Sequence, residues 1–231
     1  MDSIFERTEL VLGHKNLFVL KNSNVIVFGL GGVGGYVTEA LVRSGLGNVT
    51  LVDNDTIKIS NLNRQIIALH STVGQSKVDA FEKRINDINP DCKVKKLNMF
   101  YLPETADEVD LFSYDYIVDC IDTVTAKLEL VTRAKAAGVS IISSMGTGNK
   151  THPELLKIAD ISKTSVCPLA RVVRTELKKR GIYHLKCVFS TEEPVKVSAV
   201  DGSRHIPGST AFVPSVAGLL IAAEVVRDLT S

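Results

Sequence analysis

Glycines crowd into one short stretch near the start of the chain. Residues 25–28 are four consecutive apolar residues, typical of a strand that is buried on both faces. The glycines that follow are Gly29, Gly31, Gly32, Gly34 and Gly35. Without side chains they let backbone N–H groups approach a phosphate, and a helix expected over residues 33–44 adds its unpaired N-terminal donors. The stretch predicts a nucleotide site that fits a dinucleotide and ATP equally well.

Two carboxylates follow the next apolar run. Leu51 and Val52 are expected in a second buried strand, and Asp53 and Asp55 come just after it. An acidic residue at that strand end is placed to accept hydrogen bonds from ribose hydroxyls. We therefore expect both carboxylates on the nucleotide side of the site.

A polar segment after this strand, which we call the polar arm, helps to distinguish an ATP site from a dinucleotide site. It carries Asn61, Asn63, Arg64 and Gln65 within a few residues. The arginine offers a planar fork of donors for phosphate, and Asn61 and Gln65 can orient oxygens without adding charge. A surface loop can carry such residues for solubility alone, but a dinucleotide-binding unit does not need them.

A lysine follows the arm on the next helix. This helix is expected over residues 74–89 because apolar residues recur there with near-helical spacing. Lys77 lies one turn into it. From there the ammonium can point back to the glycine loop and meet a phosphate, or it can remain an ordinary solvated lysine.

Two aspartates bracket the end of a strand expected over residues 114–121. Asp119 and Asp122 lie at the edge where ligands bind in open parallel sheets. A carboxylate there can hold a magnesium ion between protein and phosphate oxygens. Asp122 can also serve as the N-cap of the helix expected over residues 123–137, and the two roles are compatible.

The remaining segments supply the elements that position these residues. We expect two helical pieces before residue 21, broken near Gly13. Apolar residues there, namely Leu10, Val11, Leu17, Phe18 and Leu20, are expected against the main body. Arg7 in the first piece reads, from its own pattern, as a solvated arginine.

Strands and helices alternate over most of the chain. Strands are expected over residues 93–97, 139–143 and 155–159, and helices around residues 103–111 and over 168–179. This alternation predicts an α/β fold with a mostly parallel sheet. Beyond Gly181 the pattern becomes less clear, and residues 192–207 read as a polar loop before a last apolar helix. We expect two units, residues 1–160 for the nucleotide and a smaller substrate-side extension over 161–231 on the same body.

Composition limits the class of protein. Of the 231 residues, 45% are hydrophobic and 23% charged, and the formal net charge is +1. The charged N-terminus lacks an apolar core, so we expect no secretory signal and a cytoplasmic protein. The apolar segment over residues 213–228 is interrupted by Pro214 and Glu224, so we interpret it as a core or interface helix and not a membrane span.

The cysteines argue against a zinc site of the finger type. Cys92, Cys120, Cys167 and Cys187 are widely spaced and form no C-x-x-C pair. Reduced thiols are the expectation for a cytoplasmic chain. Cys120 at a strand end is expected to be a small buried residue and not a nucleophile.

Five motifs in order resemble the ThiF, MoeB and HesA superfamily, the prokaryotic relatives of the ubiquitin-activating enzymes. They are G-L-G-G-V-G at residues 29–34, D-N-D at 53–55, N-L-N-R-Q at 61–65, V-G-Q-S-K ending at Lys77, and D-C-I-D at 119–122. The resemblance implies a dimer of doubly wound, Rossmann-like domains of the ubiquitin-activating-enzyme type. Such enzymes bind ATP and magnesium and adenylate a carboxylate.

The same resemblance implies a role for each matched position. The glycine loop and Asp53 would hold the nucleotide, with Asn61 and Gln65 shaping the phosphate site. Arg64 and Lys77 would meet the phosphates, and Asp122 would bind magnesium. Arg7 matches an arginine that reaches into the partner subunit's site.

Motifs in the second half are similar to the tRNA threonylcarbamoyladenosine dehydratase branch. These are D-I-S-K-T at residues 160–164, P-L-A at 168–170, C-V-F-S-T-E at 187–192 and P-G-S-T at 207–210. This branch implies ATP-dependent activation of the threonyl carboxylate of the modified adenosine in tRNA, followed by ring closure. Cys187 would then be a packing residue, or it would accept an acyl group or carry sulfur. A sulfur-transfer partner protein is a further expectation.

Two alternatives remain open. One is an activator of a small ubiquitin-like sulfur-carrier protein, as in molybdopterin or thiamine biosynthesis, against which the missing C-x-x-C pairs argue. The other is a non-catalytic nucleotide-binding scaffold or NAD-binding module, against which the polar arm and Asp122 argue. A basic cluster is either a tRNA contact or a solvated helix face; it comprises Arg171, Arg174, Lys178, Lys179 and Arg180.

Overall fold

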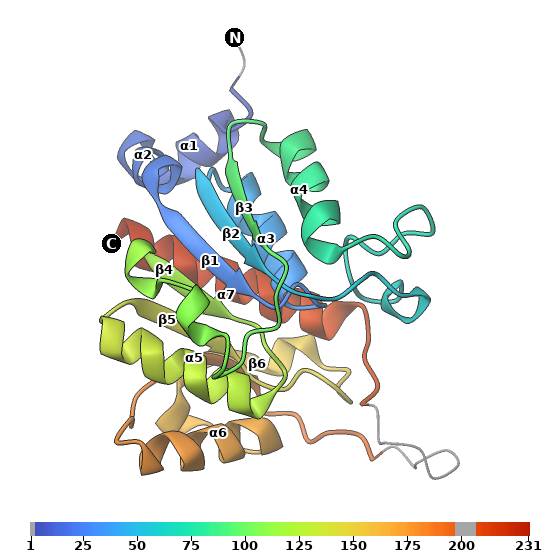
Figure 1. The fold of residues 1–231 in the computed structure, drawn as a ribbon, viewed down its shortest axis with the longest axis vertical. Coiled ribbons are helices and arrows are strands. Elements are labelled where there is room, and N and C mark those ends of the chain that lie inside the picture. The colour runs from blue at the N-terminus through green and yellow to red at the C-terminus, as the bar shows by residue number, and fades with distance from the viewer. Residues whose placement is uncertain (1–2, 197–206) are drawn as a thin grey trace.

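A seven-stranded sheet organises the part of the chain that this computed structural model describes, residues 3–196 and 207–231 (Figure 1). The strand order is β3-β2-β1-β4-β5-β7-β6, and all neighbouring pairs are parallel except β6 and β7. The strands are β1 Asn24–Phe28, β2 Asn48–Val52, β3 Lys93–Leu97, β4 Tyr116–Asp119, β5 Ser140–Ser144, β6 Leu156–Asp160 and β7 Lys186–Ser190.

Helices cover both faces of this sheet (Figure 1). One apolar core joins the sheet to α3, α4 and α7, and a second joins it to α5, α6 and the segment before β4. The bounds are α1 Glu6–Leu12, α2 His14–Asn22, α3 Gly34–Arg43, α4 Lys77–Ile88, α5 Val124–Ala137, α6 Pro168–Lys179 and α7 Phe212–Thr230. The fold is therefore the doubly wound α/β architecture that the sequence predicts.

The strand order reverses between β1 and β4. The first three strands extend the sheet in one direction, and β4 begins the other half. A crevice forms at such a switch point, outside the carboxyl ends of the strands. The glycine loop after β1 and the D-C-I-D motif after β4 meet there.

Most expected elements are confirmed, with two exceptions. The helix expected around residues 103–111 is wrong: only short 3₁₀ turns occur, at Ala106–Glu108 and Leu111–Ser113. Asp110 ends any continuous helix, because its extended backbone lets its side chain accept a hydrogen bond from the Phe112 N–H at 3.1 Å. The sequence pattern also missed β7, which lies between β5 and β6 in the same sheet.

The N-terminal helices depart from expectation in their packing. They break at Gly13 as predicted, and Leu17 and Leu20 are buried. Leu10 and Val11, however, are each 83% exposed, and Phe18 is 63% exposed. The expectation that these three cover the main body is wrong within a single chain.

The last helix, α7, is a core element as expected. It packs along α3 and against the sheet, and its Glu224 Oε1 accepts a hydrogen bond from Lys186 Nζ of β7 at 2.8 Å. Among the residues that the structure describes, no helix combines the length and the apolar character needed to cross a membrane. The polar loop expected over residues 192–207 falls largely on residues 197–206, outside the described part.

Candidate active site

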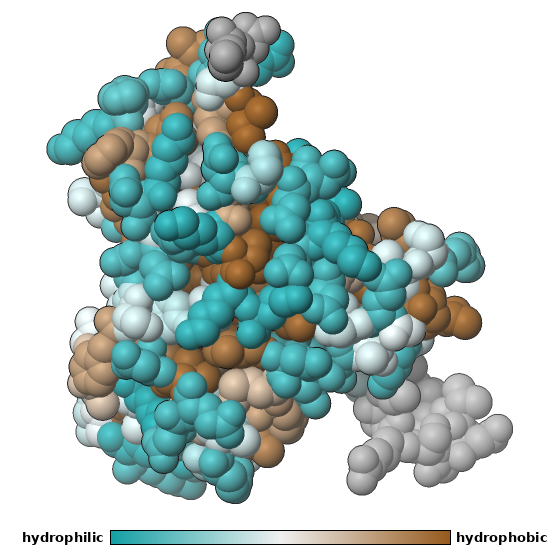
Figure 2. Space-filling model, turned by 45° about the horizontal axis from the view of Figure 1, so that its top comes forward, coloured by the Kyte–Doolittle hydropathy of each residue, from teal (hydrophilic) through white to brown (hydrophobic). Residues whose placement is uncertain are grey.

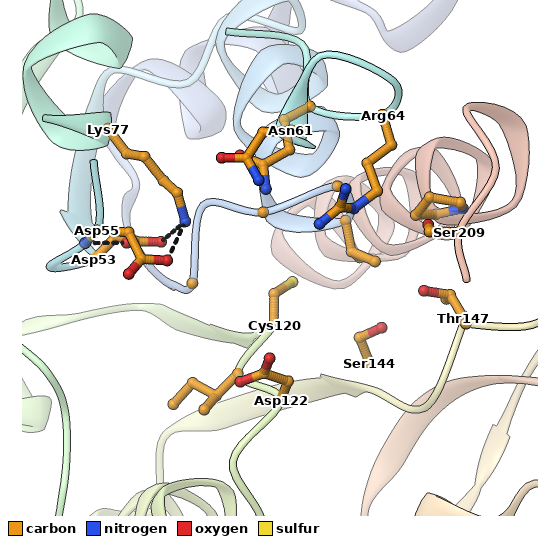
Figure 3. Close-up of a pocket in the computed structure, with 18 of the residues that line it drawn as sticks. Asp53, Asp55, Asn61, Arg64, Lys77, Cys120, Asp122, Ser144, Thr147 and Ser209 are labelled. Atoms are coloured by element: carbon orange, nitrogen blue, oxygen red, sulfur yellow. Dashed lines mark hydrogen bonds and ion pairs between the residues drawn. The ribbon is translucent and has the colours of Figure 1, made fainter. Parts of the chain in front are cut away.

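A cleft of about 640 Å³ opens at the carboxyl ends of β1, β2, β4 and β5 (Figure 3). One side, the glycine-loop wall, comprises Gly29, Gly31, Gly32, Val33, residues 52–55, Lys58, Ser60, Asn61, Arg64, Gln65 and Lys77. The opposite side, the β5 wall, comprises residues 144–148, Leu169 and 207–209. Residues 120–122, at the tip of β4, form the floor between them.

Two glycines make the close packing under the cleft possible. Gly29 has a φ of +84°, and a Cβ there would lie 2.7 Å from the carbonyl oxygen of Cys120. A Cβ on Gly34 would lie 1.8 Å from the carbonyl oxygen of Gly29. Gly29, Gly31 and Gly32 line the cleft, whereas Gly34 lies behind it and lets α3 begin directly against the end of β1.

Lys77 is buried in the glycine-loop wall and is not the solvated lysine that its spacing also allowed. It is 4% exposed, and its Nζ lies 3.3 Å from Asp53 Oδ2 and 2.8 Å from Asp55 Oδ2 (Figure 3). Asp53 Oδ2 also accepts a hydrogen bond from the Leu30 N–H at 2.7 Å. These bonds use two of the three ammonium donors, so one remains for a ligand among the described contacts.

The polar arm points its side chains into the cleft from above (Figure 3). Asn61 is buried, and its Oδ1 accepts from the Lys58 N–H at 2.9 Å. The Gln65 side chain is buried as well, and its Oε1 has no hydrogen-bond partner in the described structure. A buried oxygen of this kind implies a bound group or a water molecule that donates a hydrogen bond to it.

Arg64 lies at the end of the arm, between the two walls. Its Nη1 donates to the Ser60 carbonyl at 2.8 Å and to Asn63 Oδ1 at 2.9 Å. Asn63 Nδ2 in turn donates to the carbonyl oxygen of Ser209 at 2.9 Å. The arm thereby connects the glycine-loop wall to the β5 wall, and the remaining guanidinium donors face the cleft (Figure 3).

Asp122 lies on the floor with its carboxylate towards the cleft (Figure 3). The N-cap of α5 is Thr123, and neither residue makes a side-chain cap bond to the helix backbone, so the expected N-cap role of Asp122 is wrong. Its one described hydrogen bond is a weak 3.5 Å contact from Thr123 Oγ1. Nowhere in the described chain, Asp122 included, do three or more His, Cys, Asp or Glu side chains gather as metal ligands, so a cation at Asp122 would need oxygens from a ligand.

Two residues that the sequence did not indicate belong to this region. Tyr101 lines the cleft, is 4% exposed and stacks edge-on against Phe28 at 4.8 Å between ring centroids. Its hydroxyl has no described partner, and burial raises its pKa to about 12, so the phenol remains a donor. Lys127 is fully buried beneath the floor. The sequence around Tyr101 and Lys127 carries no distinctive motif, because Tyr101 follows an ordinary strand and Lys127 lies in an ordinary helix pattern.

The cysteines are packing residues in this structure. Cys187 lies in β7, is 0% exposed and has its pKa raised to about 12 by burial. Burial also raises the pKa of Cys120, which borders the cleft floor. A neutral thiol is a poor nucleophile, so neither residue is prepared for an acyl-accepting role.

Arg7 and all five residues of the basic cluster lie away from the cleft lining. Arg7 is exposed on α1. In the cluster, Arg174 turns inward, and its Nη1 donates to the Thr164 carbonyl at 3.0 Å. Lys179 and Arg180 both pair with Glu176. Only Arg171 and Lys178 remain exposed without a described ion pair.

A doubly wound sheet with a glycine loop, an acidic second-strand tip and cationic groups at its switch point defines a nucleotide-binding α/β protein with a site for phosphate chemistry. More narrowly, the chain belongs to the ThiF family, which it matches over residues 5–231. The expected superfamily is thereby confirmed.

The chain is also similar to individual proteins and solved structures. The chain is 46% identical over 238 residues to the tRNA threonylcarbamoyladenosine dehydratase of Bacillus subtilis, covering 97% of this chain and 94% of that protein. It is similar to the crystal structure of Escherichia coli tRNA N6-threonylcarbamoyladenosine dehydratase in complex with ATP, with a TM-score of 0.89, 31% identity and coverage of 97% and 93%. The molybdopterin-synthase adenylyltransferase of Escherichia coli is 37% identical over 125 residues, 54% of this chain and 49% of that protein.

Proposed function

We propose that this protein is an ATP-dependent dehydratase that adenylates the threonyl carboxylate of threonylcarbamoyladenosine in tRNA. The observation that carries the proposal is a cleft in which Arg64, Lys77 and Asp122 converge near the glycine loop. Near full-length similarity to dehydratases of that name supports the choice of substrate. A tRNA substrate is consistent with a cytoplasmic protein.

The chemistry needs cations more than it needs a protein nucleophile. A carboxylate oxygen attacks the α-phosphorus of ATP, the bond to pyrophosphate breaks, and an acyl-AMP mixed anhydride forms through that oxygen. The neighbouring carbamoyl group then attacks the acyl carbon and expels AMP, so the nucleoside loses the elements of one water. Because ring closure is intramolecular, the substrate itself supplies proximity. The buried thiols of Cys120 and Cys187 fit a pathway without a covalent enzyme intermediate.

The glycine-loop wall would hold the triphosphate. Backbone N–H groups of the loop and the start of α3 would meet phosphate oxygens. Arg64 and the free donor of Lys77 would stabilise the charge that develops on pyrophosphate. Asp53 and Asp55 hold Lys77 in place by the ion pairs described above.

Asp122 fits a magnesium ion. Its carboxylate faces the cleft and has only one weak hydrogen bond, so its oxygens are available. Magnesium in nucleotide sites typically takes one or two carboxylates and completes its shell with phosphates and water. When bound, the ion would neutralise phosphate charge, and Asp122 would fix its place opposite Lys77.

We further propose a homodimer in which Arg7 reaches the partner's site. Arg7 shares a helix face with Leu10 and Val11, which are three and four residues on and 83% exposed. Exposed apolar residues beside a charged group are typical of a protein interface. An interface on α1 would cover them and carry Arg7 to the partner. A sulfur-transfer partner protein stays a prediction.

Pyrophosphate exchange into ATP separates the proposed substrate from the alternative. Exchange that depends on tRNA carrying threonylcarbamoyladenosine, and not on unmodified tRNA, is the expected result. Exchange that depends instead on a small protein ending in Gly-Gly would favour the sulfur-carrier activator. That reading has less support, since the molybdopterin-synthase adenylyltransferase matches only 54% of this chain.

A further inference from the structure

A fully paired lysine lies directly beneath the cleft floor. Lys127 on α5 and Asp119 at the end of β4 both have side chains that are 0% exposed, with 2.7 Å between Nζ and Oδ2. Lys127 Nζ also donates to Ser143 Oγ and to the Ser144 carbonyl, each at 3.0 Å. All three ammonium donors are therefore used, so Lys127 can act on a ligand only through its neighbours.

Those neighbours belong to the two strand ends that meet at the cleft. Asp119 Oδ1 accepts a hydrogen bond from the Ile121 N–H at 3.1 Å, one residue before Asp122. Ser144 begins the β5 wall, and Ser143 Oγ donates to Asp119 Oδ2 at 2.5 Å. One ammonium thus connects the backbone that carries Asp122 to the backbone that starts the β5 wall.

We propose that Lys127 is a positioning residue that sets the separation between Asp122 and the β5 wall. The proposal rests on the proposed function, in which Asp122 faces the phosphates. The acyl substrate would then meet the β5 wall, on the other side of the floor. Two loops held only by apolar contacts could slide relative to each other. A charged hydrogen-bond network in a buried interior of low dielectric restrains direction as well as distance.

The positive charge of Lys127 adds to this restraint. A buried ammonium is retained only with matched acceptors, because an unpaired charge in the interior is strongly unfavourable. Here the acceptors are one carboxylate, one hydroxyl and one carbonyl, which come from β4 and β5 alone. Lysine in this place therefore specifies the relative position of those two strand tips and of no other part of the cleft.

Amide hydrogen exchange on Lys127→Met tests the proposal without any substrate. We expect amides of residues 120–122 and 144–148 to exchange at least about tenfold faster than in the unaltered protein, while residues 29–35 do not change. The matched control is Lys186→Met, which loses pairs with Glu224 and Asp228 at 2.8 and 2.7 Å outside the cleft lining. If Lys127→Met does not fold, the double variant Asp119→Asn with Lys127→Met removes both buried charges together.

Turnover then tests whether Lys127 acts through Asp122. We expect Lys127→Met to lower kcat about 50-fold with the KM for ATP changed less than about threefold, and to add less than about fivefold when combined with Asp122→Asn. Unchanged exchange in a folded variant, or fully additive effects with Asp122→Asn, overturns the proposal. If the unaltered protein does not act on the modified tRNA, the proposed function fails, and the exchange measurement still decides the role of Lys127.

Discussion

The two walls of the cleft differ in how they are built and in what they offer a ligand. The glycine-loop wall comes from residues 29–77, and it carries buried charge in the Lys77 pairs with Asp53 and Asp55. The β5 wall combines residues 144–148, Leu169 and 207–209 from three distant parts of the chain. It offers neutral hydroxyls, backbone groups and apolar surface.

We infer from this difference that the two walls bind different parts of the ligands. Fixed cations suit phosphates, which every nucleotide-dependent relative must bind. A neutral wall suits the less charged acyl and nucleoside parts of a substrate, where relatives can differ. Figure 2 shows one face of the whole molecule, on which hydrophobic residues lie between hydrophilic ones. We make predictions for the floor, for the partner subunit's contribution, for the β5 wall and for the surface outside both walls.

The largest effect should follow from Asp122→Asn at the floor. We expect AMP formation to fall by roughly 10³-fold, because the site would lose its carboxylate for the metal. Initial rates at saturating ATP, magnesium and modified tRNA measure it. Asp91→Asn, at an exposed residue outside the cleft lining, is the control. A loss below about threefold would remove Asp122 from the mechanism.

Arg7→Ala should lower turnover about 100-fold through loss of one cationic group at the partner's site. Mixed with Asp122→Asn protein, it should recover about a quarter of full activity, because half of randomly exchanged dimers would contain one complete site. Lys15→Ala, an exposed cation on α2, is the control. An absence of recovery after proven subunit exchange would contradict the shared site.

Thr147→Val should affect the β5 wall alone. The side chain keeps its shape but loses one hydroxyl. Because one hydrogen bond to the substrate would be lost, we expect the KM for tRNA to rise about 2- to 10-fold. The KM for ATP should stay the same. Thr132→Val is the matched control, since its hydroxyl bonds to the Leu128 carbonyl on α5 at 2.8 Å. An equal rise in the KM for ATP would contradict the division between the walls.

An effect of similar size is expected outside both walls, at Arg171 and Lys178. Reversing both charges to Glu should weaken tRNA binding about fivefold and reduce its log–log salt slope by about 1.5. Lys15→Glu with Lys135→Glu makes the same charge change elsewhere on the surface. If both double variants bind tRNA with the same salt slope, α6 does not contact the nucleic acid.

The glycine-loop wall could be predicted from the sequence because its residues lie close together in the chain. Gly29, Asp53, Arg64 and Lys77 fall within one stretch whose spacing reflects a strand, a turn and a helix. The polar arm carried the most information, since it distinguishes ATP chemistry from simple dinucleotide binding. Most strands and helices were also predictable, because buried runs and amphipathic patterns mark them.

The rest of the site depends on contacts between distant segments. Asn63 donates a hydrogen bond to Ser209, which is 146 positions away in the sequence, and no local pattern predicts such a contact. Lys127 looks like an ordinary helix lysine until β4 and β5 surround it. The strand β7 was missed since its five residues follow an irregular stretch and pair only with β5 and β6. Tertiary packing decided each of these cases.

Mass spectrometry of tRNA nucleosides tests the central claim most directly. Purified protein is incubated with ATP, magnesium and tRNA that carries threonylcarbamoyladenosine, and the tRNA is then digested to nucleosides under mild conditions. We expect conversion of threonylcarbamoyladenosine to a product lighter by one water, with AMP and pyrophosphate formed in equal amounts. Unchanged threonylcarbamoyladenosine, with a protein whose nucleotide binding is intact, would contradict it.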